Sequence, residues 1–309
     1  MQFNKISAFC FAIIALSLAS CGGDKFSQVV DIDLPEHVPM LSVSAEFSSV
    51  DTILVANVST TWPTVNEPAD PFVKDASVRV FENGTLWREL IYNVNTNGTG
   101  RYDWVGDADF VADGSTVYRL EVAAPGFETV FAEQKMPKKV ELISLKFTPQ
   151  GSVSPDGDKV DDLTFEFQDP AGTEDYYGLA AYANYTQIDT FGQVPDTFVY
   201  NYNLNIESFD PLLEEGAGTL LLLSDKSFDG KKVTLKTYSY SVFGTESGYH
   251  IIGHLVHLTR EKYFYLRSLN QYQNAHDNPF AEPVTVQSNI ENGVGVFSLE
   301  SLDTMQVRF

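Results

Sequence analysis

The stretch Val78–Trp87, VRVFENGTLW, decides the fold class of this chain. Val78 and Val80 flank a single arginine, which gives the two-residue period of a strand with one buried face. The pair Asn83-Gly84 then interrupts the pattern, and this pair favours the positive φ angles of a two-residue hairpin turn. The stretch therefore predicts an antiparallel β-hairpin.

The same alternation continues on both sides of this hairpin. Leu41, Val43 and Ala45 are separated by polar residues, and residues 118–122 repeat the pattern. About seven such segments, at regular spacing, are typical of an antiparallel β-sandwich. We expect the first sandwich domain to occupy residues 40–137.

A second strand-rich region follows Met136–Lys139, which we take as the domain boundary. Alternation resumes at Leu163–Phe167 and persists to the last residues. One segment departs from it, because apolar residues recur at helical spacing between residues 260 and 273, after a possible capping residue, Thr259. Residues 138–309 are therefore predicted to form a second antiparallel sandwich with one helix packed on it. The chain as a whole is predicted to be mainly β.

The N-terminus has the pattern of a lipoprotein signal peptide. Lys5 precedes the apolar run Ile6–Leu18, which is too short to span a bilayer permanently. Small residues then lead to Cys21, and Leu18–Cys21 resembles the lipobox of bacterial lipoproteins, in which this cysteine is lipidated. An ordinary secretory signal with a chance cysteine is the alternative. We expect residues 1–20 to be the signal and residues 21–39 to be a polar tether.

Composition narrows the class of partner. The chain has 42 acidic against 20 basic residues and a formal net charge of -22. Such a charge repels nucleic acid, so a DNA- or RNA-binding role is excluded. The two cysteines are Cys10, inside the signal, and Cys21, so the mature chain is expected to contain no disulfide.

An acidic segment offers a candidate metal site. Asp156, Asp158, Asp161 and Asp162 fall within seven residues around Gly157. Several carboxylates at a sharp turn suit a hard cation such as calcium. The EF-hand pattern is incomplete, because no glutamate stands at its twelfth position. The segment is therefore interpreted as a calcium loop or, alternatively, as a solvated linker before a strand.

Three histidines form a second candidate. His250, His254 and His257 would share one face of a helix and could then hold zinc. Gly253 and the surrounding isoleucine, leucine and valine residues favour a strand instead. In a strand, His250 and His254 share a face roughly 13 Å apart and His257 points the other way. We favour ordinary strand histidines.

Tyrosines gather in residues 176–202. Each has an apolar body and a polar tip, which suits stacking on a glycan or contact with a protein. Aromatic residues also fill strands well, and this simpler explanation is favoured. The residues concerned are Tyr176, Tyr177, Tyr182, Tyr185, Tyr200 and Tyr202, with Phe191 and Phe198.

Several longer motifs resemble one family. They are DIDLP at Asp31–Pro35, VKDASV at Val73–Val78, FDGK at Phe228–Lys231, NPFAEP at Asn278–Pro283 and SNIENGVGVF at Ser288–Phe297. Together they resemble the Bacteroidota lipoproteins grouped as the domain-of-unknown-function family 4249. The resemblance extends over nearly the whole chain after the signal.

This resemblance implies a location and a partner. Members of the family are typically outer-membrane lipoproteins associated with TonB-dependent receptors for nutrient uptake, and their first domain looks like a transthyretin-like or carboxypeptidase-regulatory-like sandwich. The first domain of this chain is therefore predicted to be immunoglobulin- or transthyretin-like. The resemblance implies no catalytic residues. Lipoproteins exported to the surface often have an acidic run after the cysteine. Here Lys25 follows Asp24 directly, so the cell surface and the periplasmic face both stay open.

The function expected from the sequence is non-enzymatic. No G-x-S-x-G, S-x-x-K or Cys/His nucleophile pattern is present. We expect a lipid-anchored outer-membrane protein that acts as a binding or accessory subunit beside a TonB-dependent nutrient transporter, with a small glycan or peptide as a possible ligand. The alternatives are a calcium-stiffened glycan-binding or adhesion module, and a surface hydrolase.

Overall fold

A computed structural model of the chain describes residues 36–63, 68, 70–94, 100–189, 196–240, 249–276 and 280–308. The signal peptide, Cys21, the first part of the tether and the DIDLP motif lie outside the described residues. So do Phe191 and the start of the NPFAEP motif. Residues 1–38 form one unit and residues 39–309 form another, and the fold below is that of the second unit.

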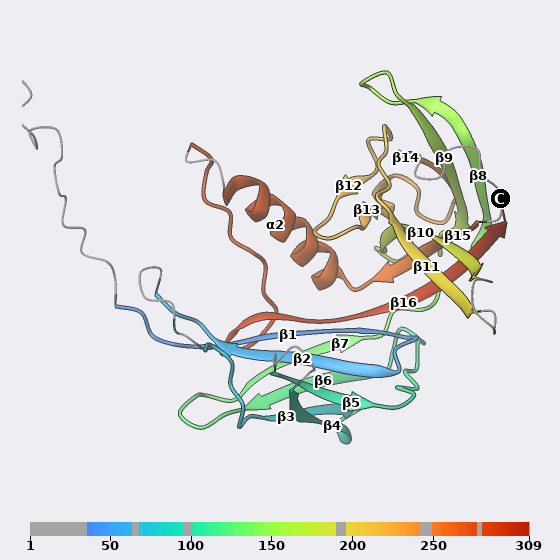
Figure 1. Cartoon of the computed structure of the whole chain (residues 1–309). Helices are drawn as coiled ribbons and strands as arrows, with labels where there is room; N and C mark the ends of the chain where they lie inside the picture. Colours follow the sequence, from blue (N-terminus) through green and yellow to red (C-terminus); the bar gives the residue numbers. More distant parts are fainter. Residues whose placement is uncertain are drawn as a thin grey trace, which may run out of the picture. The chain divides into compact units, whose positions relative to one another are not determined.

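Strands dominate this unit (Figure 1), which confirms the prediction of a mainly β protein. A large sheet has the strand order β12-β13-β10-β15-β16-β1-β2-β5-β4-β3-β6-β7, with β11 paired to β10, and a smaller sheet has the order β14-β9-β8. The strands are β1 (Leu41–Ser48), β2 (Ile53–Thr60), β3 (Ser77–Glu82), β4 (Thr85–Val94), β5 (Gly100–Val105), β6 (Val117–Ala123), β7 (Val130–Lys135), β8 (Leu142–Val153), β9 (Lys159–Gln168), β10 (Tyr176–Asp189), β11 (Asp196–Leu204), β12 (Glu214–Glu215), β13 (Leu221–Ser224), β14 (Lys232–Tyr240), β15 (His250–Leu258) and β16 (Val294–Arg308).

The first seven strands form the predicted sandwich-like arrangement. β1, β2 and β5 make one layer, β3, β6 and β7 make the other, and β4 pairs with both β3 and β5. Phe47, Tyr102 and Tyr118 are fully buried in the core that these strands share. The predicted turn is confirmed, because Asn83 and Gly84 have φ angles of 48° and 81°.

The later strands build a second core around β15. Phe165 and Phe167 of β9 pack with Tyr177 of β10 and Leu255 of β15. Gly253 lies where the sheets approach closely, since a Cβ atom there would lie 2.8 Å from the Phe165 ring and 2.9 Å from Leu145. Close packing therefore explains why a glycine stands at this position within a strand.

The last strand departs from the antiparallel pattern that the sequence predicted. β16 pairs antiparallel with β15 but parallel with β1, so it joins residues 40–137 and 138–309 in one sheet path (Figure 1). Phe297 and Leu299 belong to the first core, while Met305 and Val307 pack against the second. A strand of 15 residues extends roughly 50 Å, which lets one element supply both cores.

The predicted helix is present as α2 (Arg260–His276), three residues longer than expected. The Thr259 carbonyl accepts the N–H of Tyr263, but the Thr259 hydroxyl has no partner among the described residues. Thr259 therefore stands directly before α2, as predicted, but its hydroxyl caps no backbone N–H of the described residues. Tyr263 and Leu266 pack α2 onto β10, β13 and β15.

A buried cation also holds α2 in place. Lys262 Nζ lies 2.5 Å from Glu300 of β16 and 3.3 Å from Glu46 of β1. Burial alone would lower the Lys262 pKa, but the two carboxylates outweigh burial and raise it. Among the described residues, no helix is both long and apolar enough to cross a membrane.

Candidate functional site

A single loop, residues 169–175 between β9 and β10, borders both candidate sites of this protein. On one side it lines an open cleft of about 870 Å³. On the other it contributes to a cluster of aspartates. The remaining walls of the cleft come from residues 113–117, from the end of β7 and the segment after it, and from residues 257–261 at the start of α2.

His257 forms part of the cleft wall through two polar contacts. Its Nδ1 lies 2.7 Å from the carbonyl oxygen of Lys138, and its Nε2 lies 3.1 Å from Oδ1 of Asp175. Both partners are acceptors, so the neutral ring satisfies one of them and the protonated ring satisfies both. Burial raises the Asp175 pKa, but hydrogen bonds from His257 and Thr173 outweigh burial and lower it. The ring therefore ties the segment after β7 to the loop before β10.

The three histidines lie on a strand, as favoured from the sequence. The helical arrangement that zinc binding requires is absent, because residues 250–258 form β15. His257 is buried, whereas His250 and His254 are half-buried on the other face. His254 packs against Tyr182 with ring centroids 5.0 Å apart, and burial lowers the His254 pKa.

The predicted calcium residues are spread over a turn and a strand. Asp156 and Asp158 lie in the turn between β8 and β9, while Asp161 and Asp162 are neighbours on β9 and so point to opposite faces. Asp161 accepts a backbone N–H at 2.7 Å, and Asp162 pairs with Lys236 at 2.8 Å. The described residues do not bring the four carboxylates to one point. Calcium binding by this segment stays a prediction.

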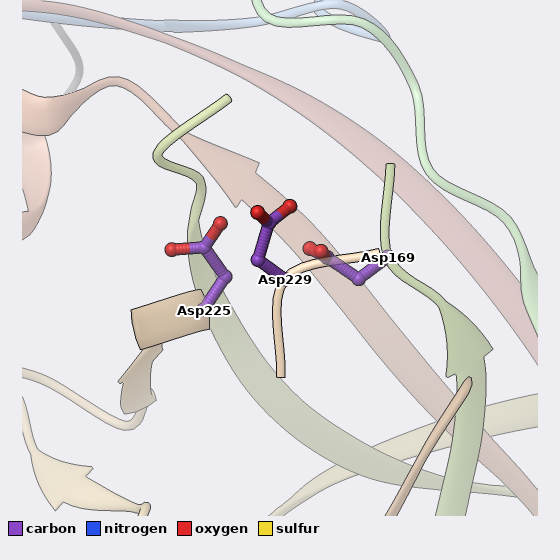
Figure 2. A group of neighbouring side chains, drawn as sticks. All are labelled: Asp169, Asp225 and Asp229. Carbon is purple, nitrogen blue, oxygen red and sulfur yellow. The ribbon is translucent and has the colours of Figure 1, made fainter. Parts of the chain in front are cut away.

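A different group of carboxylates does converge (Figure 2). The side chains of Asp169, Asp225 and Asp229 come from three separate segments, and one carboxylate oxygen of each lies within 4.8 Å of one oxygen of each of the others. Asp169 follows β9, Asp225 begins a short 3₁₀ helix at Asp225–Ser227, and Asp229 lies in the turn before β14. We call these three residues the acidic cluster.

Hydrogen bonds show what the acidic cluster does for the fold. Asp169 accepts the hydroxyl of Tyr177 at 2.6 Å and the N–H of Gly230 at 2.8 Å, and Asp229 accepts the N–H of Gly172 at 2.7 Å. These contacts clamp the loop before β10 to the turn before β14. The clamp also fixes the loop that lines the cleft.

Burial and neighbouring carboxylates make two members of the acidic cluster, Asp169 and Asp225, costly to ionise. Burial raises the pKa of Asp169 and of Asp225, and neighbouring carboxylates raise both further. Oxygen ligands of this kind could hold a hard cation such as calcium. Sequence reasoning missed the cluster, although FDGK at Phe228–Lys231 was noticed for its resemblance, because its members are far apart along the chain.

The tyrosine-rich segment divides between core and surface. Tyr177 is fully buried, as expected for a strand-filling aromatic. Tyr200 and Tyr202 on β11 stack on each other with centroids 6.4 Å apart and are 41% and 39% exposed. Phe191 and the side chain of Phe198 lie outside the described residues. Part of the segment therefore fills the core, and part lies at the surface.

A family model described as "Domain of unknown function (DUF4249)" matches residues 28–304. The chain belongs to the DUF4249 family. The match includes the cleft and the acidic cluster of this DUF4249 protein, and it confirms the family that the sequence motifs resemble. No curated protein matches the chain.

Proposed function

We propose that this DUF4249 protein is a lipid-anchored outer-membrane protein that acts as a binding or accessory subunit beside a TonB-dependent nutrient transporter. The observation that supports this proposal is the order of segments along the chain: an apolar signal, Cys21, a polar tether, and a β-rich body whose first strand begins at Leu41. Lipoprotein processing would place two or more acyl chains on Cys21, which suffices for stable anchoring. The body would then remain near a membrane partner.

The cleft supports a binding role better than a hydrolytic one. His257 and Asp175 form the histidine–carboxylate pair of the cleft wall, as in many hydrolases. Here the other ring nitrogen faces the carbonyl of Lys138. One nitrogen therefore faces a backbone carbonyl and the other a carboxylate, and neither is free to take a proton from a nucleophile. The pair acts as a structural tie at the edge of an open cleft.

The anchor is tested by metabolic labelling in cells. The full chain with an epitope after its last residue should incorporate radioactive palmitate and sediment with the outer membrane. Cys21→Ala should lose the label and leave the membrane fraction. A wild-type chain that sediments without a label, or a labelled Cys21→Ala chain, would contradict lipidation at this residue.

The subunit role is tested by purification from mild detergent. A TonB-dependent receptor should co-purify with the epitope-tagged wild-type chain in a near-stoichiometric amount. An unrelated outer-membrane lipoprotein with the same epitope is the control. If no receptor is recovered, even after chemical cross-linking in intact cells, the proposal fails.

A further inference from the structure

The strand β7 lies at the open end of the large sheet. In the described part of the chain it pairs along its length with β6, and its other edge is bridged at one point. That bridge joins Phe131 to Glu291 through backbone hydrogen bonds of 3.4 and 2.8 Å. The protein's own chain therefore shows that this edge accepts an added extended segment.

The bridge also reveals the direction of the following backbone groups. Polar groups of alternate residues point the same way along a strand, so Glu133 and Lys135 direct their N–H and C=O groups away from β6, as Phe131 does. The register agrees, because the backbone groups of Val117, opposite Lys135, are used by Asn83 on the other side of β6: the Val117 carbonyl accepts the Asn83 N–H, and the Val117 N–H donates to Oδ1 of Asn83. No described residue bonds to these groups of Glu133 or Lys135.

These open groups border the cleft. Glu133 and Lys135 both line it. The Glu133 side chain does not close the edge, because it pairs with Arg119 at 3.1 Å on the outer face of the sheet. The Arg119 guanidinium in turn lies over the Phe131 ring, 3.8 Å from its centroid. The edge is thus accessible beside a space large enough for a peptide strand.

We propose that an extended, net-basic peptide segment of a partner protein adds to the β7 edge within this cleft. In an antiparallel arrangement, two peptide residues would each exchange a pair of backbone hydrogen bonds, one with Glu133 and one with Lys135. The proposed accessory subunit would use this contact, so the identity of the partner rests on the proposed function. Binding of a basic peptide to the β7 edge is independent of the proposed function.

Charge selects this occupant over others. The formal net charge of the chain is -22, and carboxylates outnumber cations among the residues that line the cleft. A basic segment is therefore attracted. The tether has three aspartates and one glutamate against one lysine, and a second copy of the chain is equally acidic. Both are repelled. The charged residues of the lining are Asp113, Glu133, Glu174, Asp175 and Glu261 against Lys135, Lys138 and Arg260.

Fluorescence anisotropy with two synthetic peptides tests the proposal on the full mature chain. The probe is a labelled twelve-residue peptide of alternating lysine and threonine, and the control alternates glutamate and threonine. The lysine peptide should bind with a Kd on the order of 100 µM or tighter, and the glutamate peptide at least about tenfold more weakly. No binding of the lysine peptide at about 1 mM, or equal binding of both, would overturn the proposal.

A matched pair of variants separates backbone from side chain. Glu133→Pro removes the outward N–H, and proline is tolerated at such an edge position. We expect it to weaken lysine-peptide binding at least about tenfold, whereas Glu133→Gln retains the N–H and should bind within about threefold of wild type. Equal binding by Glu133→Pro and wild type would refute the edge contact.

Amide exchange in the wild-type chain gives a readout that needs no variant. At saturating lysine peptide, the amides of Glu133 and Lys135 should exchange at least about tenfold more slowly. Binding without this protection would place the peptide elsewhere. If the peptide binds but no receptor co-purifies, the subunit role is refuted and the edge contact is not. If a receptor co-purifies but the peptide does not bind, the edge contact is refuted and the subunit role is not.

Discussion

Two buried groups of charged residues in this protein differ in the charge of their neighbours. On α2, Lys262 is 7% exposed and contacts two carboxylates, Glu46 and Glu300. Beside the cleft, Asp169 and Asp225 are 1% and 2% exposed, and their nearest charged neighbours are also carboxylates. We call the first group the lysine triad.

The difference shows how each charge is tolerated away from water. In the lysine triad, the two carboxylates compensate for the hydration that Lys262 loses, and they raise the Lys262 pKa, which favours its charged form. In the acidic cluster, a tyrosine hydroxyl and backbone N–H groups donate to the carboxylates, and raised pKa values favour protonation. Removing one charge should therefore destabilise the first group and relieve the second.

The largest expected effect comes from Lys262→Met. This change leaves Glu46 and Glu300 without their cation, and breaking a buried pair in this way costs about 3–5 kcal/mol. Urea unfolding of the soluble mature chain measures the loss. The control is Lys226→Met, because Lys226 is largely exposed and lies 4.0 Å from Glu174, so it should change stability by less than about 0.5 kcal/mol. Equal effects of the two variants would contradict the lysine triad.

An intermediate effect is expected for Tyr177→Phe. The variant keeps the ring but removes the hydroxyl that donates to Asp169 at 2.6 Å. A buried carboxylate without this donor should cost about 1–3 kcal/mol. Tyr200→Phe, at an exposed position of β11, is the matched control and should be neutral in the same thermal unfolding experiment. A neutral Tyr177→Phe would show that the hydroxyl does not support the cluster.

The smallest expected effect has the opposite sign. Asp225→Asn removes one of three mutually repelling carboxylates and should raise the melting temperature at pH 7 by about 2 °C in buffer with a chelator. The exposed turn residue Asp156, changed to Asn, is the control and should leave the melting temperature unchanged. A lower melting temperature for Asp225→Asn would mean that the carboxylate stabilises the fold.

The pH dependence sharpens this last comparison. The pKa of Asp225 is raised above its ordinary value of 3.8 in the folded state, so the folded state binds the proton more tightly than the unfolded state. Stability therefore falls as the pH rises above 3.8 through the raised pKa. The advantage of Asp225→Asn should vanish near pH 4 and grow toward pH 7. An advantage that is constant with pH would contradict the raised pKa.

Local patterns predicted the local structure well. The alternation around Val80, the Asn83-Gly84 pair and the apolar residues around His254 each depend on neighbours in sequence, and the structure confirms a hairpin and two strands there. The helix at 260–273 follows from the same kind of spacing and is present.

Contacts between distant segments could not be predicted in this way. The parallel pairing of β16 with β1 depends on Gly295, where a Cβ atom would lie 1.9 Å from the carbonyl oxygen of Val43, and alternation alone does not reveal such a neighbour. Likewise, acidic density drew attention to Asp161 and Asp162, whereas the carboxylates that converge lie on three separate segments. Convergence is a property of the fold and has no local signal.

Site-specific photo-cross-linking in intact cells tests the proposed function most directly. A benzophenone amino acid replaces Lys135 at the cleft edge, and a second chain carries it at Tyr272, an exposed position on α2. We predict that the probe at position 135 captures a basic segment of a TonB-dependent transporter and that the probe at 272 does not. Failure to capture a transporter from position 135, or equal capture from both positions, would contradict the account.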